Sequence, residues 1–134
     1  MIIKVFPDKE KAKSILEMAN SREEFLKEIG KTKAYSTIVP ENYYEVIKEL
    51  CLAIILTDGY KATGENAHKE LIDFMRKYKE FNDFEIETIQ DLRIRRNKST
   101  YEGKPIEQIY LENKMDILIK IISKLKKILE RKLD

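Results

Sequence analysis

The stretch IEQIYLENKMDILIKIISKLKKILERKL, residues 106–133, decides the fold class. Its large apolar side chains recur at intervals that alternate between four and three residues: Leu111, Met115, Leu118, Ile122, Leu125 and Leu129. This spacing predicts a long amphipathic helix of about 40 Å, because residues three and four apart share one face of an α-helix. Ile117, Ile121 and Ile128 widen the apolar stripe, so we expect part of this face to meet a second subunit.

Three further helices are predicted before this one. The segment 82–103 is expected to be helical, since Glu85 completes a capping box at its start and a glycine stands at its end. A shorter helix is expected over about 67–78. The apolar segment of about 40–62 is predicted to be the central core helix, in which Gly59 marks either an early end or a close approach of another backbone.

The N-terminal residues 1–34 are predicted to form a short helical hairpin. Its first helix is expected over about 8–20, with an aspartate as the capping residue. Residues 21–24, Ser-Arg-Glu-Glu, have the pattern of a capping box, which predicts that a second short helix begins there. We expect Phe25 to face inward and Gly30 to end this second helix.

Length and composition favour a single helical domain. A chain of 134 residues is long enough for one core. Its four glycines and three prolines are too few for the turns of an all-β sandwich or barrel. We therefore predict an all-α fold in one domain, residues 1–134, in which an antiparallel bundle of four main helices (35–134) follows the N-terminal hairpin (1–34).

Charge and cysteine content exclude several classes of protein. With 37% charged residues and a net charge of +2, the chain is neither a polycation nor a disordered tail. The single cysteine, Cys51, cannot form an internal disulfide, and one cysteine with one histidine cannot furnish a zinc site. The N-terminus has no signal-like apolar segment. We therefore expect a cytoplasmic protein without a bound metal, a cofactor or a membrane partner.

Most enzyme signatures are absent from the sequence, which has no glycine-rich phosphate loop, nucleophile elbow or pair of histidines at metal-ligand spacing. Cys51 is expected on an apolar helix face, where a thiol is an inert core residue. His68 falls in the first turn of a predicted helix, where the dipole lowers the pKa of an imidazole. Two roles stay open for His68, a general base or an exposed polar residue.

The arginines are unevenly distributed, and three of the six lie within residues 93–96. A guanidinium forms a planar fork that suits phosphate or carboxylate, so this cluster is either a binding site or a salt-bridged helix face. Arg96 and Tyr101 are five residues apart and diverge by about 140° on a regular helix. We expect both to line one cleft where the helix loosens before Gly103, or where a homodimer combines two copies.

At this segment the sequence resembles the HEPN superfamily, all-α domains named for nucleotide binding in higher eukaryotes and prokaryotes. The resemblance covers about residues 35–134. It rests on YYEVIKEL (43–50) and AIILTDGYK (53–61), on AHKELI (67–72), and on residues 92–103 before the long last helix.

Many HEPN proteins are metal-independent ribonucleases with an arginine, often followed by a polar residue such as asparagine, and a histidine four to six residues after the arginine. Arg96 and Asn97 match the first half of this motif, whereas Tyr101 stands where the histidine would be. The resemblance therefore implies a divergent member, with a cleft for RNA or a nucleotide formed by Arg93, Arg96, Asn97 and Tyr101 and shared across a homodimer. A tyrosine is a poor general base near pH 7, which weighs against cleavage.

Two functions remain open after this reading. The first is binding of RNA or a nucleotide, with metal-independent endoribonuclease activity through Arg96 and Tyr101 as its catalytic form. The second is a non-catalytic interaction or accessory subunit. Some HEPN proteins partner a minimal nucleotidyltransferase in a toxin–antitoxin pair, so the resemblance implies such an enzyme as the protein partner in this second case.

Overall fold

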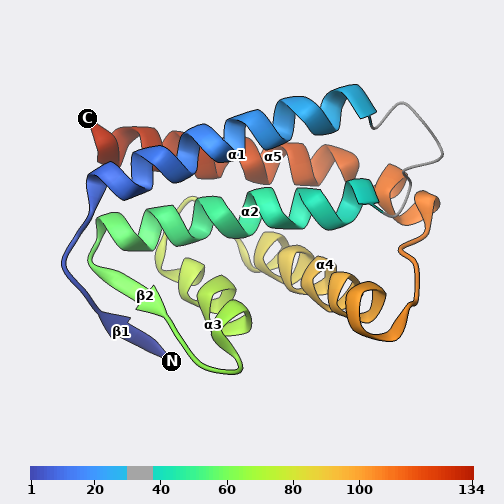
Figure 1. Ribbon diagram of the computed structural model, residues 1–134, viewed down its shortest axis with the longest axis horizontal. Coiled ribbons are helices and arrows are strands. Elements are labelled where there is room, and N and C mark those ends of the chain that lie inside the picture. Colours follow the sequence, from blue (N-terminus) through green and yellow to red (C-terminus); the bar gives the residue numbers. More distant parts are fainter. Residues whose placement is uncertain (30–37) are drawn as a thin grey trace.

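The structure is a computed structural model that describes residues 1–29 and 38–134 (Figure 1). These residues are mostly helical and contain one small two-stranded sheet, so the prediction of a helical fold is confirmed at this level. The elements are, in chain order, β1 (Ile2–Lys4), α1 (Lys9–Ile29), α2 (Ile38–Thr57), β2 (Tyr60–Ala62), α3 (Ala67–Phe74), the 3-10 turn η2 (Met75–Lys77), α4 (Asp83–Glu102) and α5 (Gln108–Leu133).

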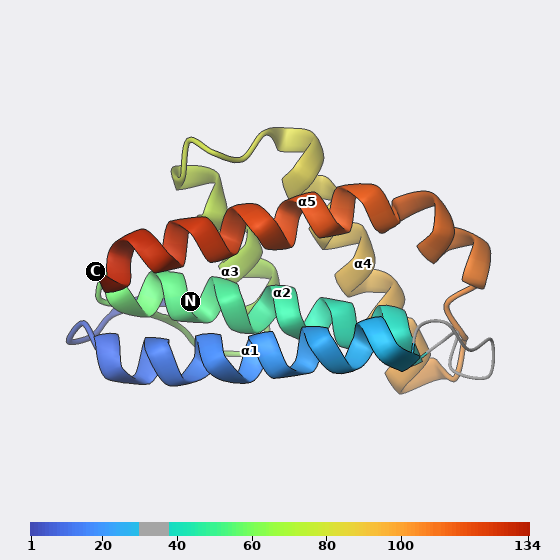
Figure 2. The same ribbon diagram turned by 90° about the horizontal axis from the view of Figure 1, so that it is seen from above.

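Helix α2 is the centre of the fold and contacts α1, α3, α4, α5 and β2. Its apolar residues cover most of its circumference, and Leu50 and Ile54 are completely buried. A helix that is apolar on all sides must be surrounded by other elements. Figures 1 and 2 show that α1, which runs antiparallel to α2, and α5 cover one side of α2, whereas α3 and α4 cover the other side.

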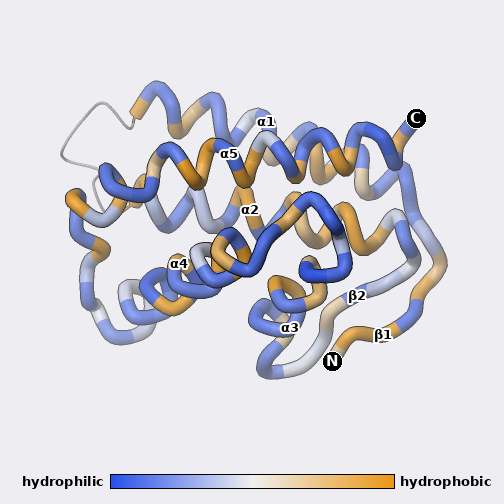
Figure 3. Tube along the Cα trace, turned by 180° about the vertical axis from the view of Figure 1, so that it is seen from behind, coloured by the Kyte–Doolittle hydropathy of each residue, from blue (hydrophilic) through white to orange (hydrophobic). Residues whose placement is uncertain are grey.

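The apolar stripe of α5 is buried within the same chain. Leu118 and Ile122 are buried as the spacing predicts, and Ile121 and Ile128 on the wider part of the stripe are buried too. Helices α1 and α2 both pack against α5, and together they cover this width. In Figure 3 apolar and polar segments alternate along α5, as an amphipathic helix requires. The stripe that suggested a second subunit is therefore largely accounted for by intrachain packing.

The predicted N-terminal hairpin is wrong, because residues 9–29 form one continuous helix, α1. Arg22 pairs with Glu49 of α2 through Nη2 and Oε1 at 2.8 Å, and the buried Glu23 pairs with Lys126 of α5. Both pairs are made from the middle of α1. These tertiary contacts favour an unbroken helix over the local capping pattern at 21–24.

Continuation of α1 also changes the predicted core. Phe25, which we expected to face inward, is exposed, because the unbroken helix turns this side chain toward solvent. Leu26, which was also expected to face inward, is buried beside Ala19 and Leu16 on the same face. Gly30, the predicted end of the second helix, lies outside the described residues.

Helix α2 ends at Thr57, earlier than the predicted Ala62, and a β-ribbon that we did not predict follows it. Gly59 has φ +83, and a Cβ there would lie 2.9 Å from the carbonyl oxygen of Val5. The amide of Val5 donates to the carbonyl of Gly59 at 2.8 Å, and β1 continues antiparallel to β2 with Ile2 opposite Ala62. Gly59 therefore both ends α2 and admits a second backbone.

The predicted boundaries of α4 are confirmed. The Asn82 side chain accepts a hydrogen bond from the Glu85 amide at 2.8 Å, and the Glu85 carboxylate accepts one from the Asn82 amide at 3.1 Å. Gly103 ends the helix in the left-handed conformation, φ +68. Cys51 is completely buried on α2, and burial raises the pKa of its thiol to about 12, as expected for an unreactive core residue.

Candidate functional site

The four residues that we selected on α4 border a single pocket of about 240 Å³ within one chain. Arg93, Arg96, Asn97 and Tyr101 form one wall. Residues 64–69, the end of the loop after β2 and the first turn of α3, form the opposite wall. We call this site the α3/α4 pocket.

Arg96 and Tyr101 border the same pocket although α4 does not loosen before Gly103. The helix is regular through Glu102, and no second copy of the chain is needed to bring the two residues to one pocket. The Arg96 side chain is only 19% exposed, whereas Tyr101 is 75% exposed. The guanidinium therefore belongs to the inner part of the pocket, and the phenol ring lies at its rim.

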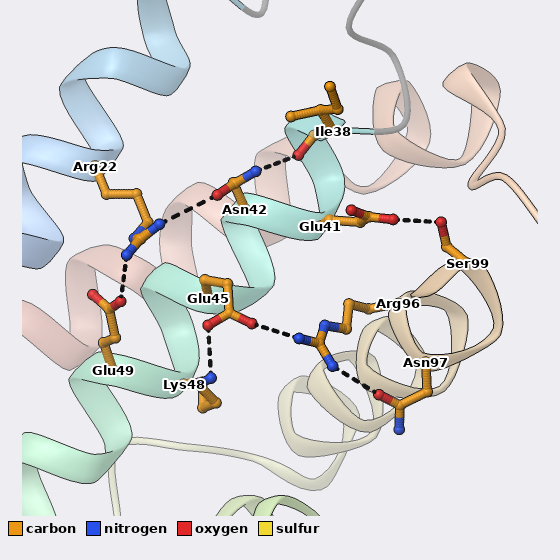
Figure 4. Close-up of polar contacts among 10 residues, drawn as sticks. All are labelled: Arg22, Ile38, Glu41, Asn42, Glu45, Lys48, Glu49, Arg96, Asn97 and Ser99. Carbon is orange, nitrogen blue, oxygen red and sulfur yellow. Dashed lines mark hydrogen bonds and ion pairs between the residues drawn. The ribbon is translucent and has the colours of Figure 1, made fainter. Parts of the chain in front are cut away.

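Contacts with α2 hold Arg96 in place (Figure 4). Its Nη2 donates to Oε1 of Glu45 at 3.1 Å, and its Nη1 donates to Oδ1 of Asn97 at 3.2 Å. Glu45 also pairs with Nζ of Lys48 at 2.6 Å, and the Arg96 guanidinium lies 5.8 Å from the ring centre of Tyr44. An arginine has five N–H donors, so Arg96 keeps donors for a ligand while it holds these contacts.

Arg93 has a different environment from Arg96. Its Nε donates to Oε1 of Gln90 at 2.7 Å, and the amide of Gln90 donates in turn to Oδ1 of Asp73 at 3.0 Å. Among the residues that the structure describes, no carboxylate lies within ion-pair distance of Arg93. A neutral partner thus orients this arginine, and its positive charge remains available for an anionic ligand.

His68 also lines the α3/α4 pocket, a position that sequence reasoning did not connect with the arginines. Partial burial lowers its pKa, as does the positive charge of Lys48. Glu45 opposes this shift, and Arg96 and Arg93 add to it. The pKa is lowered in the direction that the first-turn position predicts, so the imidazole is neutral near pH 7. The location of His68 follows from the packing of α3 on α4.

The pocket has an excess of positive charge. Lys69, Arg93 and Arg96 line it, with Glu65 as the opposing carboxylate. Asn66 stands at the N-cap of α3, but its side chain makes no capping hydrogen bond. The amide of Ala67 donates to the carbonyl of Gly64 at 3.2 Å, and the next amides, of His68 and Lys69, keep donor capacity at the positive end of the helix dipole. This combination suits an anion with several oxygen acceptors.

A larger pocket of about 610 Å³ lies elsewhere, at the C-terminal end of α5, and has weaker chemistry for a ligand. Two of its cations are already paired, Lys124 with Glu85 at 2.8 Å and Arg131 with Glu80. It also lacks the histidine and the exposed aromatic ring of the α3/α4 pocket. We therefore take the smaller pocket as the candidate site.

Within residues 1–29 and 38–134, no group of three or more His, Cys, Asp or Glu residues is placed to hold a metal ion. No helix in these ranges combines the length and apolarity that a membrane span requires. The chain matches no known family model, no curated protein and no solved structure.

Proposed function

We propose that this protein is a HEPN-like domain that binds the phosphate of RNA or of a nucleotide in the α3/α4 pocket. The observation that carries the proposal is the gathering of Arg93, Arg96, Asn97, Tyr101 and His68 around one pocket. Guanidinium groups bind phosphate oxygens through parallel N–H bonds, and an exposed aromatic ring offers a nucleobase a stacking surface.

The balance of charge supports a phosphate ligand over a neutral one. Three cationic side chains and one carboxylate line the pocket. Behind them, Glu45 pairs with both Lys48 and Arg96, so this one carboxylate is shared between two cations. The first turn of α3 adds backbone N–H donors. A phosphate group carries one or two negative charges and several acceptor oxygens, which match this excess.

His68 favours a catalytic form of this function, a metal-independent endoribonuclease. In this reaction the ribose 2′-OH attacks the adjacent phosphorus and the bond to the 5′ oxygen breaks, which leaves a 2′,3′-cyclic phosphate and a 5′-OH. Neutral His68 accepts the 2′-OH proton, and Arg96 stabilises the charge that develops on the phosphorane oxygens. Tyr101 donates its hydroxyl proton to the leaving 5′ oxygen and is then reprotonated by His68.

Binding is tested by titration of the protein into labelled single-stranded RNA at several salt concentrations. We expect Arg93→Ala to weaken binding at least tenfold and to flatten the salt dependence. The variant makes fewer phosphate contacts, so its binding releases fewer counterions from the RNA. The matched control is Arg76→Ala, which removes an exposed arginine outside the pocket. Equal affinity of the two variants, or no binding by the wild-type protein at low salt, would contradict the proposal.

Cleavage is tested by incubating labelled RNA with the protein in excess chelator. We expect His68→Gln and Arg96→Ala to abolish cleavage while RNA binding stays measurable, as interactions made mainly in the transition state require. Formation of a 2′,3′-cyclic phosphate identifies the reaction. Undiminished cleavage by both variants, or no cleavage by the wild type, contradicts the catalytic form and leaves binding as the function.

A homodimer belongs to the same proposal. Phe84 and Ile94 on α4 and Ile109 on α5 are large apolar side chains exposed on the single chain, and such surface is commonly covered in symmetric dimers. Light scattering at micromolar concentration tests this point, and a monomer contradicts it. If the protein is instead an accessory subunit, the same side chains bind a partner such as a nucleotidyltransferase, and RNA affinity is absent.

A further inference from the structure

A second pocket, of about 310 Å³, lies on α4 beside the segment that leads into α5. Three cationic side chains, Arg95, Lys98 and Lys104, line it together with the carboxylates of Asp91 and Glu107. We call this site the α4/α5 pocket. It shares no lining residue with the α3/α4 pocket, so the function proposed above does not explain it.

The end of α4 brings the two lysines together. Gly103 reverses the chain in the left-handed conformation, and the amide of Lys104 then donates to the carbonyl of Lys98 at 3.2 Å. The Lys104 side chain is 68% exposed, and its nearest acidic partner, Glu102, is 3.8 Å away. Within the described part of the chain, no carboxylate lies within ion-pair distance of Lys98. The Lys98 ammonium is therefore unpaired among these residues, and the Lys104 ammonium has only a long, exposed ion pair that it can exchange for a bound anion.

Arg95 is the ordered member of this cluster. Its Nε donates to Oδ2 of Asp91 at 3.0 Å, and its guanidinium carbon lies 4.1 Å from the ring centre of Tyr110. An arginine held by a carboxylate on one edge and an aromatic ring on one face has a fixed orientation. Glu107, at the N-cap of α5, makes no side-chain capping bond, so its carboxylate is not held by the first amides of α5.

The two pockets border one exposed stripe of α4. Lys98 lines the α4/α5 pocket, and Tyr101, three residues later, lines the α3/α4 pocket. Residues at this spacing are neighbours on a helix surface, with about 5–6 Å between their Cβ atoms. A helix with its side chains is about 10–12 Å across. One phosphate group cannot occupy both pockets, whereas the backbone of a strand several nucleotides long reaches from one to the other.

We propose that the α4/α5 pocket is a second phosphate subsite, and that the ligand is single-stranded RNA whose backbone crosses the last turns of α4 from one pocket to the other. The inference rests on the proposed function of the α3/α4 pocket, and it selects a polynucleotide over a mononucleotide. Tyr101 stacks on a base between the two phosphates. Lys98, Lys104 and Arg95 hold the second phosphate, and Asp91 orients Arg95.

The test compares uridine 5′-monophosphate with an octauridylate in titrations of the full chain. The double variant Lys98→Gln/Lys104→Gln removes the two exposed cations of the α4/α5 pocket. The matched control is Lys11→Gln/Lys13→Gln, which removes two exposed lysines of α1 and changes the net charge equally. Arg93→Ala serves as the α3/α4 pocket variant, and thermal unfolding checks that each variant is folded.

We expect the wild type to bind the octauridylate at least tenfold more tightly than the monophosphate. The α4/α5 double variant loses this advantage and reduces the salt slope by about one, as the loss of one to two phosphate contacts to a single strand predicts, while its affinity for the monophosphate stays within twofold. Arg93→Ala weakens the binding of both ligands. The control double variant leaves both affinities unchanged.

Two outcomes overturn the inference alone. In the first, the wild type binds the monophosphate and Arg93→Ala removes this binding, but the wild type binds the octauridylate no more tightly than the monophosphate. The other is an equal loss of octauridylate affinity in the control and α4/α5 double variants, which assigns the effect to net charge. Absence of binding to both ligands by the wild type overturns the proposed function as well.

Discussion

The guanidinium of Arg96 donates to the carboxylate of Glu45 over 3.1 Å, and this contact joins α4 to α2 beside the α3/α4 pocket. Glu45 is therefore a built-in anion next to the proposed phosphate site. A bound phosphate shares the charge of Arg96 with this carboxylate, so Glu45 reduces the affinity of the pocket for anions.

Replacement of Glu45 by glutamine is expected to strengthen phosphate binding about tenfold, which corresponds to about 1.4 kcal/mol. Glutamine still accepts a hydrogen bond from Arg96 but carries no charge. The control is Glu49→Gln on the same helix, because Glu49 pairs with Arg22 of α1 at 2.8 Å and does not line the pocket. Titration of a nucleoside monophosphate measures the effect. Weaker binding by the Glu45 variant would show that orienting Arg96 matters more than the charge.

The affinity for phosphate is expected to rise as the pH falls below about 7. Burial and the charges of Lys48, Arg96 and Arg93 lower the pKa of His68 below its ordinary value of 6.5, with Glu45 in opposition, and a bound phosphate reverses this shift. Phosphate binding therefore takes up a proton. His68 is the single histidine of the sequence, so NMR assigns its titration directly. A midpoint that phosphate leaves unchanged contradicts the placement of His68 at the site.

The same shift makes a prediction for the protein without a ligand. Because the pKa of His68 is lowered in the folded chain, the unfolded chain binds this proton more tightly. Its contribution to stability is complete above about pH 6.5 and is lost as the pH falls through the unfolded value toward the folded one. His68→Gln is expected to flatten the fall in melting temperature between pH 7 and pH 5, and an identical profile for the variant and the wild type would refute this.

Leu118→Ala in the middle of α5 is expected to cost about 2–5 kcal/mol of stability, because it leaves a cavity in a close-packed core. Its neighbour Ile119 provides the control, since Leu118 is completely buried whereas Ile119 is 48% exposed. Ile119→Ala is expected to cost less than about 1 kcal/mol. Urea unfolding of both variants measures the difference. Similar losses in the free energy of unfolding would show that the buried face of α5 has been assigned incorrectly.

Gly59→Ala is expected to destabilise the protein more than Gly103→Ala. Both glycines have positive φ, but a Cβ at Gly59 meets the Val5 carbonyl at 2.9 Å, whereas a Cβ at Gly103 meets nothing within 4 Å. We expect about 1 kcal/mol for the conformational cost at Gly103 and about 2–4 kcal/mol at Gly59, where the clash adds to it. Equal losses in denaturant unfolding would mean that the N-terminal segment moves aside.

Long periodic segments could be predicted from the sequence, and features set by tertiary contacts could not. The stripe through Leu118 and Ile122 and the capping box at Asn82 are local patterns, and the structure contains both. The continuity of α1 depends on Arg22 meeting Glu49 of another helix. The β-ribbon has strands of only three residues, too short for an alternating pattern, and its pairing is between segments far apart in the sequence.

The site was predictable on α4 alone. The local concentration of arginine selected Arg93 and Arg96, but the second wall of the pocket comes from α3. The presence of His68 beside them depends on how α3 packs against α4, and no spacing in the sequence encodes that. We expected Arg96 and Tyr101 to share a cleft through a loosened helix or a second copy of the chain, whereas the pocket borders both residues on one unbroken helix.

The burial of Cys51 makes site-specific conjugation straightforward. Maleimide reagents react with the thiolate, and the Cys51 thiol is both enclosed and, with a pKa of about 12, protonated at working pH. Because the sequence has no other cysteine, Glu17→Cys on the exposed surface of α1 creates a single attachment point without removing the native residue. Helix α1 lies across α2 from α3 and α4 (Figure 1), so a dye placed there reports tumbling and distance without entering either pocket.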